Sequence, residues 1–279
     1  MLRIPVSISG ILEHELTADE KVMLENFSGI NSLIIDLEAL VLYRLCLMLP
    51  NGKRVLEIGS YRGGSTVALG HAARMSNHKI FCIDMWSDYD QQSDFINVDK
   101  LQLNDMGILS EFMDNTAFVK DRLCMMRGNA TDFSEILGHN RFSLIFIDGA
   151  HDYFSVVDDI LCGLKTIEPG GILCGHDYHS AGVDVKKAVH DTIMQSETVA
   201  VKGLIENTSI WYAVIDDPEY EFLLVRTIKQ MALGDFEGAH ALLMENVGTI
   251  KQTAEVARLL KGLEDRNRKS QRFDDGSCI

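Results

Sequence analysis

Short apolar runs separated by turns and amphipathic segments are the main pattern of this chain. Residues 55–58 form an apolar run, a glycine-bearing turn follows from Gly59 to Gly64, and apolar residues recur at helical spacing over 65–73. Later runs of the same kind lie at 79–83, 123–127, 142–147 and 172–175. Buried strands that alternate with helices predict an α/β fold with a doubly wound, mostly parallel sheet.

The ends of the chain have a different character. Thr17, with Glu20 three residues later, predicts a capped helix to Phe27. Asp36, Glu38 and Arg44 interrupt the apolar stretch from Leu33 to Leu49, which favours a packed helix over a membrane span. After residue 215, helical spacing resumes on both sides of Gly234-Asp235 and again over 249–264. We therefore expect an N-terminal segment, a main domain, a helical extension and a disordered tail, with bounds 1–31, 32–215, 216–266 and 267–279.

Composition narrows the range of partners. The chain has 279 residues, 46% of them hydrophobic, and a formal net charge of −15. Such a surface repels phosphate backbones, and no basic stripe with interleaved aromatic residues is present, so a nucleic-acid partner is disfavoured and a small molecule is favoured. The six cysteines show no zinc spacing and no paired motif. Together with the lack of a signal-peptide pattern they predict a cytoplasmic protein with reduced, mostly buried thiols and no membrane partner; a homo-oligomer is left open.

The turn after residue 58 carries the first candidate chemistry. Glycines allow a sharp bend and let a ligand approach bare peptide groups at a helix N-terminus. Gly59 is followed by Ser60, Tyr61 and Arg62 before Gly63, so neither the dinucleotide spacing nor a P-loop lysine is present. Glu57 would repel a pyrophosphate, whereas it can accept hydrogen bonds from an ammonium or a hydroxyl group.

An acidic residue, one further residue and then glycines, as in Glu57-Ile58-Gly59, resembles the first motif of class I S-adenosylmethionine-dependent methyltransferases. The similarity is greatest to small-molecule O-methyltransferases of natural products and sugars, some of them metal-dependent, and it covers about residues 33–215. It implies a seven-stranded Rossmann-like sheet with S-adenosylmethionine as the cofactor. The methionine end would then lie at Glu57, Gly59, Ser60 and Gly63.

The ends of the next two strands supply candidates for the rest of the cofactor. Asp84 ends the second strand, and ligands of open parallel sheets bind beyond the carboxyl ends of the strands, so Asp84 is expected to hold the ribose hydroxyls, with Met85 beside it. A capping role for Asp84 is the alternative. The resemblance places Asn129 and Ala130 around the adenine, although an ordinary turn explains them almost equally well. The long segment Met85–Asn104 is expected to be a lid that recognises the substrate.

Acidic and histidine residues follow strands four and five. Asp148 and Asp177 should lie side by side, where two carboxylates can hold Mg²⁺ or Mn²⁺ and lower the pKa of a substrate hydroxyl. Relatives commonly carry two acids where this chain has His176-Asp177, and His151 occupies an Asp-Gly-x-His position that recurs in the subgroup. Three interpretations remain open: a metal site of Asp148, Asp177 and His176, with His176 as ligand or base; metal-free catalysis by His176 or His151; and a structural cluster.

The sequence therefore predicts a methyltransferase that acts on a hydroxyl group of a small molecule. Asp148, His151 and His176 are the catalytic candidates, and Asp148 also borders the cofactor. A nicotinamide-dependent oxidoreductase is less favoured because the glycine spacing is broken. A non-catalytic cofactor-binding or scaffold protein that interacts through its C-terminal helices is the third hypothesis.

Overall fold

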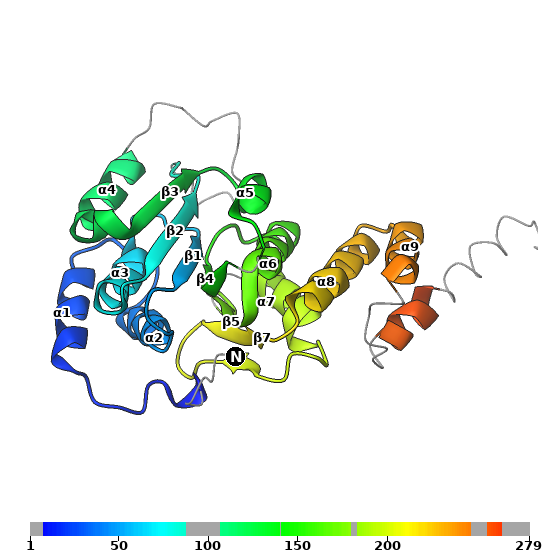
Figure 1. The fold of residues 1–279 in the computed structure, drawn as a ribbon, viewed down its shortest axis with the longest axis horizontal. Helices are drawn as coiled ribbons and strands as arrows, with labels where there is room; N and C mark the ends of the chain where they lie inside the picture. The colour runs from blue at the N-terminus through cyan, green and yellow to red at the C-terminus, as the bar shows by residue number, and fades with distance from the viewer. Residues whose placement is uncertain (1–7, 88–106, 140, 180–182, 247–255, 264–279) are drawn as a thin grey trace, which may run out of the picture.

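A seven-stranded sheet forms the centre of the computed structural model, which describes residues 8–87, 107–139, 141–179, 183–246 and 256–263 (Figure 1). The strand order is β3-β2-β1-β4-β5-β7-β6; β7 runs antiparallel to β5 and β6, and the other strand pairs are parallel. The strands are β1 Arg54–Ile58, β2 Lys79–Asp84, β3 Leu123–Arg127, β4 Phe142–Ile147, β5 Ile167–Gly175, β6 Lys202–Leu204 and β7 Trp211–Ile215. This confirms the predicted doubly wound α/β fold.

Helices cover both faces of the sheet, as the apolar content of the strands requires. One core cluster joins the sheet to α1, α2, α3 and α4, and a second joins it to α5, α6 and α7. Along β1, Val55 belongs to the first cluster and Leu56 to the second, because successive side chains of a strand point to opposite faces. The helices are α1 Ala18–Phe27, α2 Asp36–Leu47, α3 Gly64–Ser76, α4 Gly107–Asn115, α5 Ala130–Leu137, α6 Tyr153–Thr166, α7 Val183–Val189, α8 Pro218–Ala232 and α9 Phe236–Asn246.

Three details differ from the sequence expectations. β5 begins at Ile167 rather than 172, because the Pro169-Gly170-Gly171 segment is an irregularity within the strand, where the register to β4 shifts. α2 begins at Asp36, and the preceding residues 32–35 are not helical. Cys124 is exposed, whereas Cys46, Cys82, Cys162 and Cys174 are buried and free, as expected.

The C-terminal helices have a small core of their own. α8 and α9 share a cluster that includes Leu224 and Leu243, and residues 256–263 add a further helical segment. Val225 of α8 also belongs to the core cluster beneath α6 and α7, so the extension is anchored on the main domain. The predicted tail and residues 88–104 of the predicted lid lie outside the described residues. Within the described ranges, no helix is both long and apolar enough to cross a membrane.

Candidate active site

A cavity of about 1620 Å³ opens beyond the carboxyl ends of β1 to β5. Its lining begins with the glycine turn after β1 and with Asp84 and Met85 after β2, and it continues to the ends of β4 and β5. Two further segments line it, residues 32–35 before α2 and residues 204–209, from the end of β6 to the loop before β7. The topology of the parallel sheet therefore gathers polar residues from distant parts of the chain into one space.

The glycine turn is fixed by the protein's own backbone. Gly59 has φ +86°, and a Cβ atom there would lie 2.0 Å from the carbonyl oxygen of Asp148. Gly63, with φ +89°, precedes the first residue of α3, and a Cβ there would lie 3.0 Å from Thr116 Cγ2. Gly59 and Ser60 line the cavity, together with Tyr61, whereas Gly63 is not among its lining residues. Gly63 thus has a structural role at the start of α3, and the approach of a ligand to it stays a prediction.

Asp84 holds the turn in place. Its Oδ2 accepts hydrogen bonds from the backbone N–H groups of Ser60 at 2.6 Å and Tyr61 at 2.8 Å, and its Oδ1 accepts one from Trp86 N at 2.5 Å. Both predicted roles are thus compatible, because a carboxylate has about four acceptor positions and Asp84 also lines the cavity. Contact with a ribose stays a prediction.

Glu57 lies beneath the turn, not at the cavity surface. Its side chain is fully buried and Oε2 accepts hydrogen bonds from the hydroxyl groups of Ser60 at 2.6 Å and Thr66 at 2.5 Å. Burial raises the pKa of this carboxyl group, and the hydroxyl donors partly oppose that. Glu57 is not among the residues that line the cavity, whereas its hydrogen-bond partner Ser60 is; contact of Glu57 with an ammonium group stays a prediction.

Met85, Asn129 and Ala130 line the cavity, as expected for the nucleoside end. Asn129 is the N-cap residue of α5, and its backbone N–H donates to Asp132 Oδ2 at 3.1 Å, so it also has a local structural role. Their contact with adenine stays a prediction. Sequence reasoning missed several lining residues of the cofactor side, chiefly Gly64, Ser65 and the acidic face of α6.

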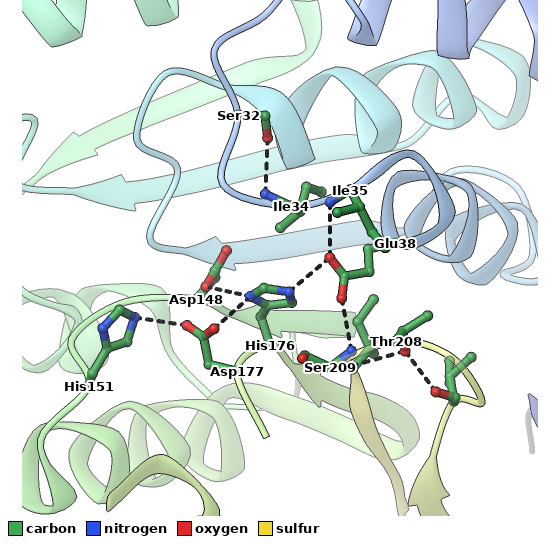
Figure 2. Close-up of polar contacts among 12 residues, drawn as sticks. Ser32, Ile34, Ile35, Glu38, Asp148, His151, His176, Asp177, Thr208 and Ser209 are labelled. Carbon is green, nitrogen blue, oxygen red and sulfur yellow. Dashed lines mark hydrogen bonds and ion pairs between the residues drawn. The ribbon is translucent and has the colours of Figure 1, made fainter. Parts of the chain in front are cut away.

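Four ionisable residues meet at the ends of β4 and β5 (Figure 2). His151 Nε2 lies 2.8 Å from Asp177 Oδ2, and His176 Nδ1 lies 3.2 Å from Asp177 Oδ1 and 3.5 Å from Asp148 Oδ1. Asp177 has φ +62°, a left-handed conformation that is uncommon for residues other than glycine and that often marks a functional position. The structure thus brings together all four residues predicted for the reacting end.

Glu38 is a fifth member that sequence reasoning did not identify. It reaches the cluster from α2, with Oε2 2.9 Å from His176 Nε2, and its side chain is buried. Its Oε1 accepts a hydrogen bond from Ser209 N at 2.8 Å and its Oε2 accepts one from Ile35 N at 3.0 Å. Glu38 therefore connects His176 to the segment before α2 and to the loop before β7 (Figure 2). The interruption of the apolar stretch 33–49 by an acid was the available signal.

The charges of the cluster are coupled. Burial lowers the pKa of His176, but hydrogen bonds to Asp148, Asp177 and Glu38 outweigh it and raise the pKa to about 12. The hydrogen bond to Asp177 raises the pKa of His151, whereas burial raises that of Asp148. With no bound cation, His176 keeps its proton at neutral pH and acts as a donor, which disfavours it as the general base.

Asp148, His151 and Asp177 have the geometry of a cation site. One potential ligand atom from each lies within 4.8 Å of the others, and all three residues line the cavity. The predicted ligand set contained His176 in place of His151. Since His176 is enclosed by three carboxylates, His151 is the better placed imidazole. Two carboxylates and one imidazole suit a divalent ion such as Mg²⁺ or Mn²⁺.

Comparisons with known proteins agree with this architecture. Residues 56–178 match the family model described as a methyltransferase domain. A methyltransferase from Podospora anserina, PaMTH1, solved with SAH bound, is 18% identical, with a TM-score of 0.50 over 73% of this chain and 90% of that one. A Corynebacterium glutamicum protein gives the same TM-score at 13% identity, over 72% and 91%. The comparison with curated proteins gives no match.

The matched segment spans the glycine turn, Asp84 and the whole reacting cluster, and the strand order is that of the Rossmann-like methyltransferase fold. Residues 56–178 are thus similar to a methyltransferase domain, and the chain has the Rossmann-like methyltransferase fold. This similarity favours the methyltransferase hypothesis over the oxidoreductase and scaffold hypotheses.

Proposed function

We propose that the protein transfers the methyl group of S-adenosylmethionine to a hydroxyl oxygen of a small molecule. The observation that carries the proposal is the position of the Asp148, His151 and Asp177 cluster, which lines the same cavity as the glycine turn. A sulfonium bound over the turn would therefore face groups that can orient a hydroxyl and accept its proton. The SAH bound to PaMTH1 supports the choice of cofactor.

The cofactor would bind along the strand ends. The backbone of Gly59, Ser60 and Tyr61 would hold the methionine end, and the remaining acceptor positions of Asp84 would bind the ribose hydroxyls. Met85, Asn129 and Ala130 would surround the base. Since the backbone of the turn is already held by Asp84, little ordering is needed when the cofactor enters, which favours affinity.

Asp148, His151 and Asp177 would hold the divalent cation. When bound, such an ion supplies positive charge that lowers the pKa of a nearby hydroxyl group. During transfer the hydroxyl oxygen bonds to the methyl carbon, the carbon–sulfur bond breaks, and the hydroxyl proton passes to this cluster. Glu38 and His176 would keep the two carboxylates at their separation. Alignment of the hydroxyl with the methyl group provides most of the rate gain.

The charge of the cavity supports a neutral or cationic acceptor. Its described lining carries the acidic side chains of Glu38, Asp84, Asp148, Asp152, Asp158, Asp177 and Glu206. These groups repel phosphates, so a nucleic acid is disfavoured as the substrate. A cytoplasmic location and a homo-oligomer remain predictions.

The test is a transfer assay with S-adenosylmethionine that carries a tritiated methyl group. The purified protein is offered phenols, catechols, amino sugars and sugars, and products are identified by mass spectrometry and NMR. We expect label on an oxygen atom, and a loss of at least about 100-fold for Asp177→Ala. Transfer to nitrogen or carbon, or full activity of that variant, would contradict the proposal.

A further inference from the structure

Asp159 of α6 is an acid that the proposed reaction does not use. It lines the cavity, and within the described ranges it takes part in no hydrogen bond or ion pair. Its neighbour Asp158, in contrast, is paired with Lys229 of α8. Asp159 is half-buried at the cavity wall and has no partner among the described residues, so its carboxyl group is available to a ligand that enters the cavity.

The position of Asp159 is defined by two contacts. Its Oδ2 lies 2.8 Å from the point that a Cβ atom on Gly149 would occupy, so the glycine after β4 leaves room for this carboxyl group. One turn further along α6, Cys162 Sγ lies 3.5 Å from the carbonyl oxygen of Ala130. Residues three apart share a helix face. Asp159 is therefore located between the end of β4 and the start of α5.

The strand order indicates which part of the cofactor reaches this place. The reacting cluster lies at the ends of β4 and β5, while β1, β2 and β3 follow in that order on the other side of β4. A cofactor whose sulfonium faces the cluster therefore extends its nucleoside toward Met85, Asn129 and Ala130. Asp159 lies one turn of α6 before Cys162, which contacts Ala130, so it is on the side of the cavity that the nucleoside would occupy.

We propose that the Asp159 carboxyl group binds the adenine base of the cofactor, accepting from the 6-amino group and donating to an adjacent ring nitrogen. The inference rests on the proposed function, since it takes S-adenosylmethionine as the ligand. A protonated carboxyl group offers one donor and one acceptor side by side, and adenine presents the complementary pair. No basic side chain is required.

The surroundings of Asp159 favour its protonated form. Burial, followed by the charges of Asp158 and Asp152, raises its pKa to about 8. The charged groups near it are these two aspartates on its own helix and Lys229 of α8, which is bound to Asp158. At pH 7 the group therefore retains a proton to donate, and it loses that proton as the pH rises through about 8.

The test uses calorimetric titration of the full-length protein with two probes, SAH and its analogue with unsubstituted purine in place of adenine. For Asp159→Leu at pH 7 we expect SAH to bind about 10-fold to 100-fold more weakly, whereas Asp159→Asn, whose amide also donates and accepts, stays within about threefold. The wild type should prefer SAH to the purine analogue, and Asp159→Leu should lose that preference. Glu135→Gln, an exposed acid on α5 outside the cavity lining, is the matched control.

A pH series separates binding from a structural effect. The ratio of SAH affinities, wild type to Asp159→Asn, should fall as the pH rises from 7 to 9, because only the acid loses its donor. Unchanged SAH affinity in Asp159→Leu, or an unchanged preference between the two probes, would overturn the inference. Failure of the wild type to bind SAH at all would instead overturn the proposed function.

Discussion

The two ends of the cavity use carboxylates in opposite ways. At the β1–β2 end, Asp84 accepts three backbone hydrogen bonds and thereby fixes the shape of the glycine turn. At the β4–β5 end, Asp148, Asp177 and Glu38 surround a single imidazole, so charge is concentrated there. The hydrogen bonds of Asp84 hold the binding surface in shape before a ligand enters. The carboxylates around His176 concentrate negative charge at the other end of the cavity. We infer that recognition of the cofactor and activation of the acceptor are separate tasks of separate carboxylates.

Gly59→Ala should have the largest effect on stability, because it disrupts the close packing of the turn after β1 against the backbone of Asp148 at the end of β4. The new methyl group would lie 2.0 Å from Asp148 O, in a backbone conformation with φ +86° that alanine disfavours. We expect a loss of about 4 kcal/mol in the free energy of unfolding, measured in urea. Gly52→Ala is the control, since Gly52 has φ +79° but nothing within 4 Å, and should cost about 1 kcal/mol. Equal losses of unfolding free energy in the two variants would contradict this prediction, because the backbone would then have moved to remove the clash with Asp148.

Asp177→Ala should break only the charged end. It removes one of three candidate ligands, so Mn²⁺ affinity, measured by electron paramagnetic resonance titration, should fall at least about 100-fold. SAH affinity should remain within about threefold, because the turn and Asp84 are untouched. Retained Mn²⁺ binding would show that the ligand set is wrong. Loss of SAH binding would show that the two ends are not separate.

Asp84→Ala should break only the cofactor end. Three backbone N–H groups lose their acceptor, so we expect SAH affinity in calorimetry to fall about 10-fold to 30-fold. Asp84→Asn keeps one carbonyl acceptor, so its SAH affinity should lie between that of the wild type and that of Asp84→Ala. Mn²⁺ affinity should not change in either variant. Unchanged SAH affinity in Asp84→Ala would refute both the ribose contact and the fixing of the turn.

Glu38→Gln should have the smallest effect on stability of these variants. It tests how far the cluster around His176 depends on α2. It removes a charge 2.9 Å from His176 Nε2, and we expect a loss of about 1 kcal/mol in unfolding free energy. The folded-state pKa of His176 is raised, so its ion pairs contribute fully below the ordinary histidine pKa and less as the pH rises toward about 12.

The pH dependence of this variant follows from that sign. Because His176 keeps its proton throughout this range in both variants, the destabilisation by Glu38→Gln should be nearly equal at pH 6 and pH 9, when both are measured by urea unfolding. Glu25→Gln, at an exposed position of α1, should have almost no effect at either pH. A penalty that falls strongly between pH 6 and pH 9 would mean that His176 loses its proton in this range, which would contradict the raised pKa.

The reacting end was predictable from the sequence because it depends on strand ends. Once apolar runs define β4 and β5, parallel pairing brings Asp148, His176 and Asp177 to one edge, whatever the helices do. The burial of Glu57 was also available in principle. It lies two residues after Val55, so the alternation of a strand places both on the face covered by α3.

Glu38 and Asp159 could not be assigned in this way. Glu38 contacts Ser209, which is 171 positions away, and that contact depends on how the start of α2 meets the loop before β7. Asp159 follows another aspartate on a helix, a pattern that usually marks a solvated face. The sequence also could not show why residue 59 must be glycine, since the backbone that leaves no room for a side chain there belongs to the end of β4.

The most direct test of the central claim is calorimetric titration of the chelator-treated protein with S-adenosylmethionine, without and then with Mn²⁺. We predict micromolar binding in both cases and a separate heat for Mn²⁺ that Asp177→Ala removes. Absence of S-adenosylmethionine binding under both conditions would contradict the account.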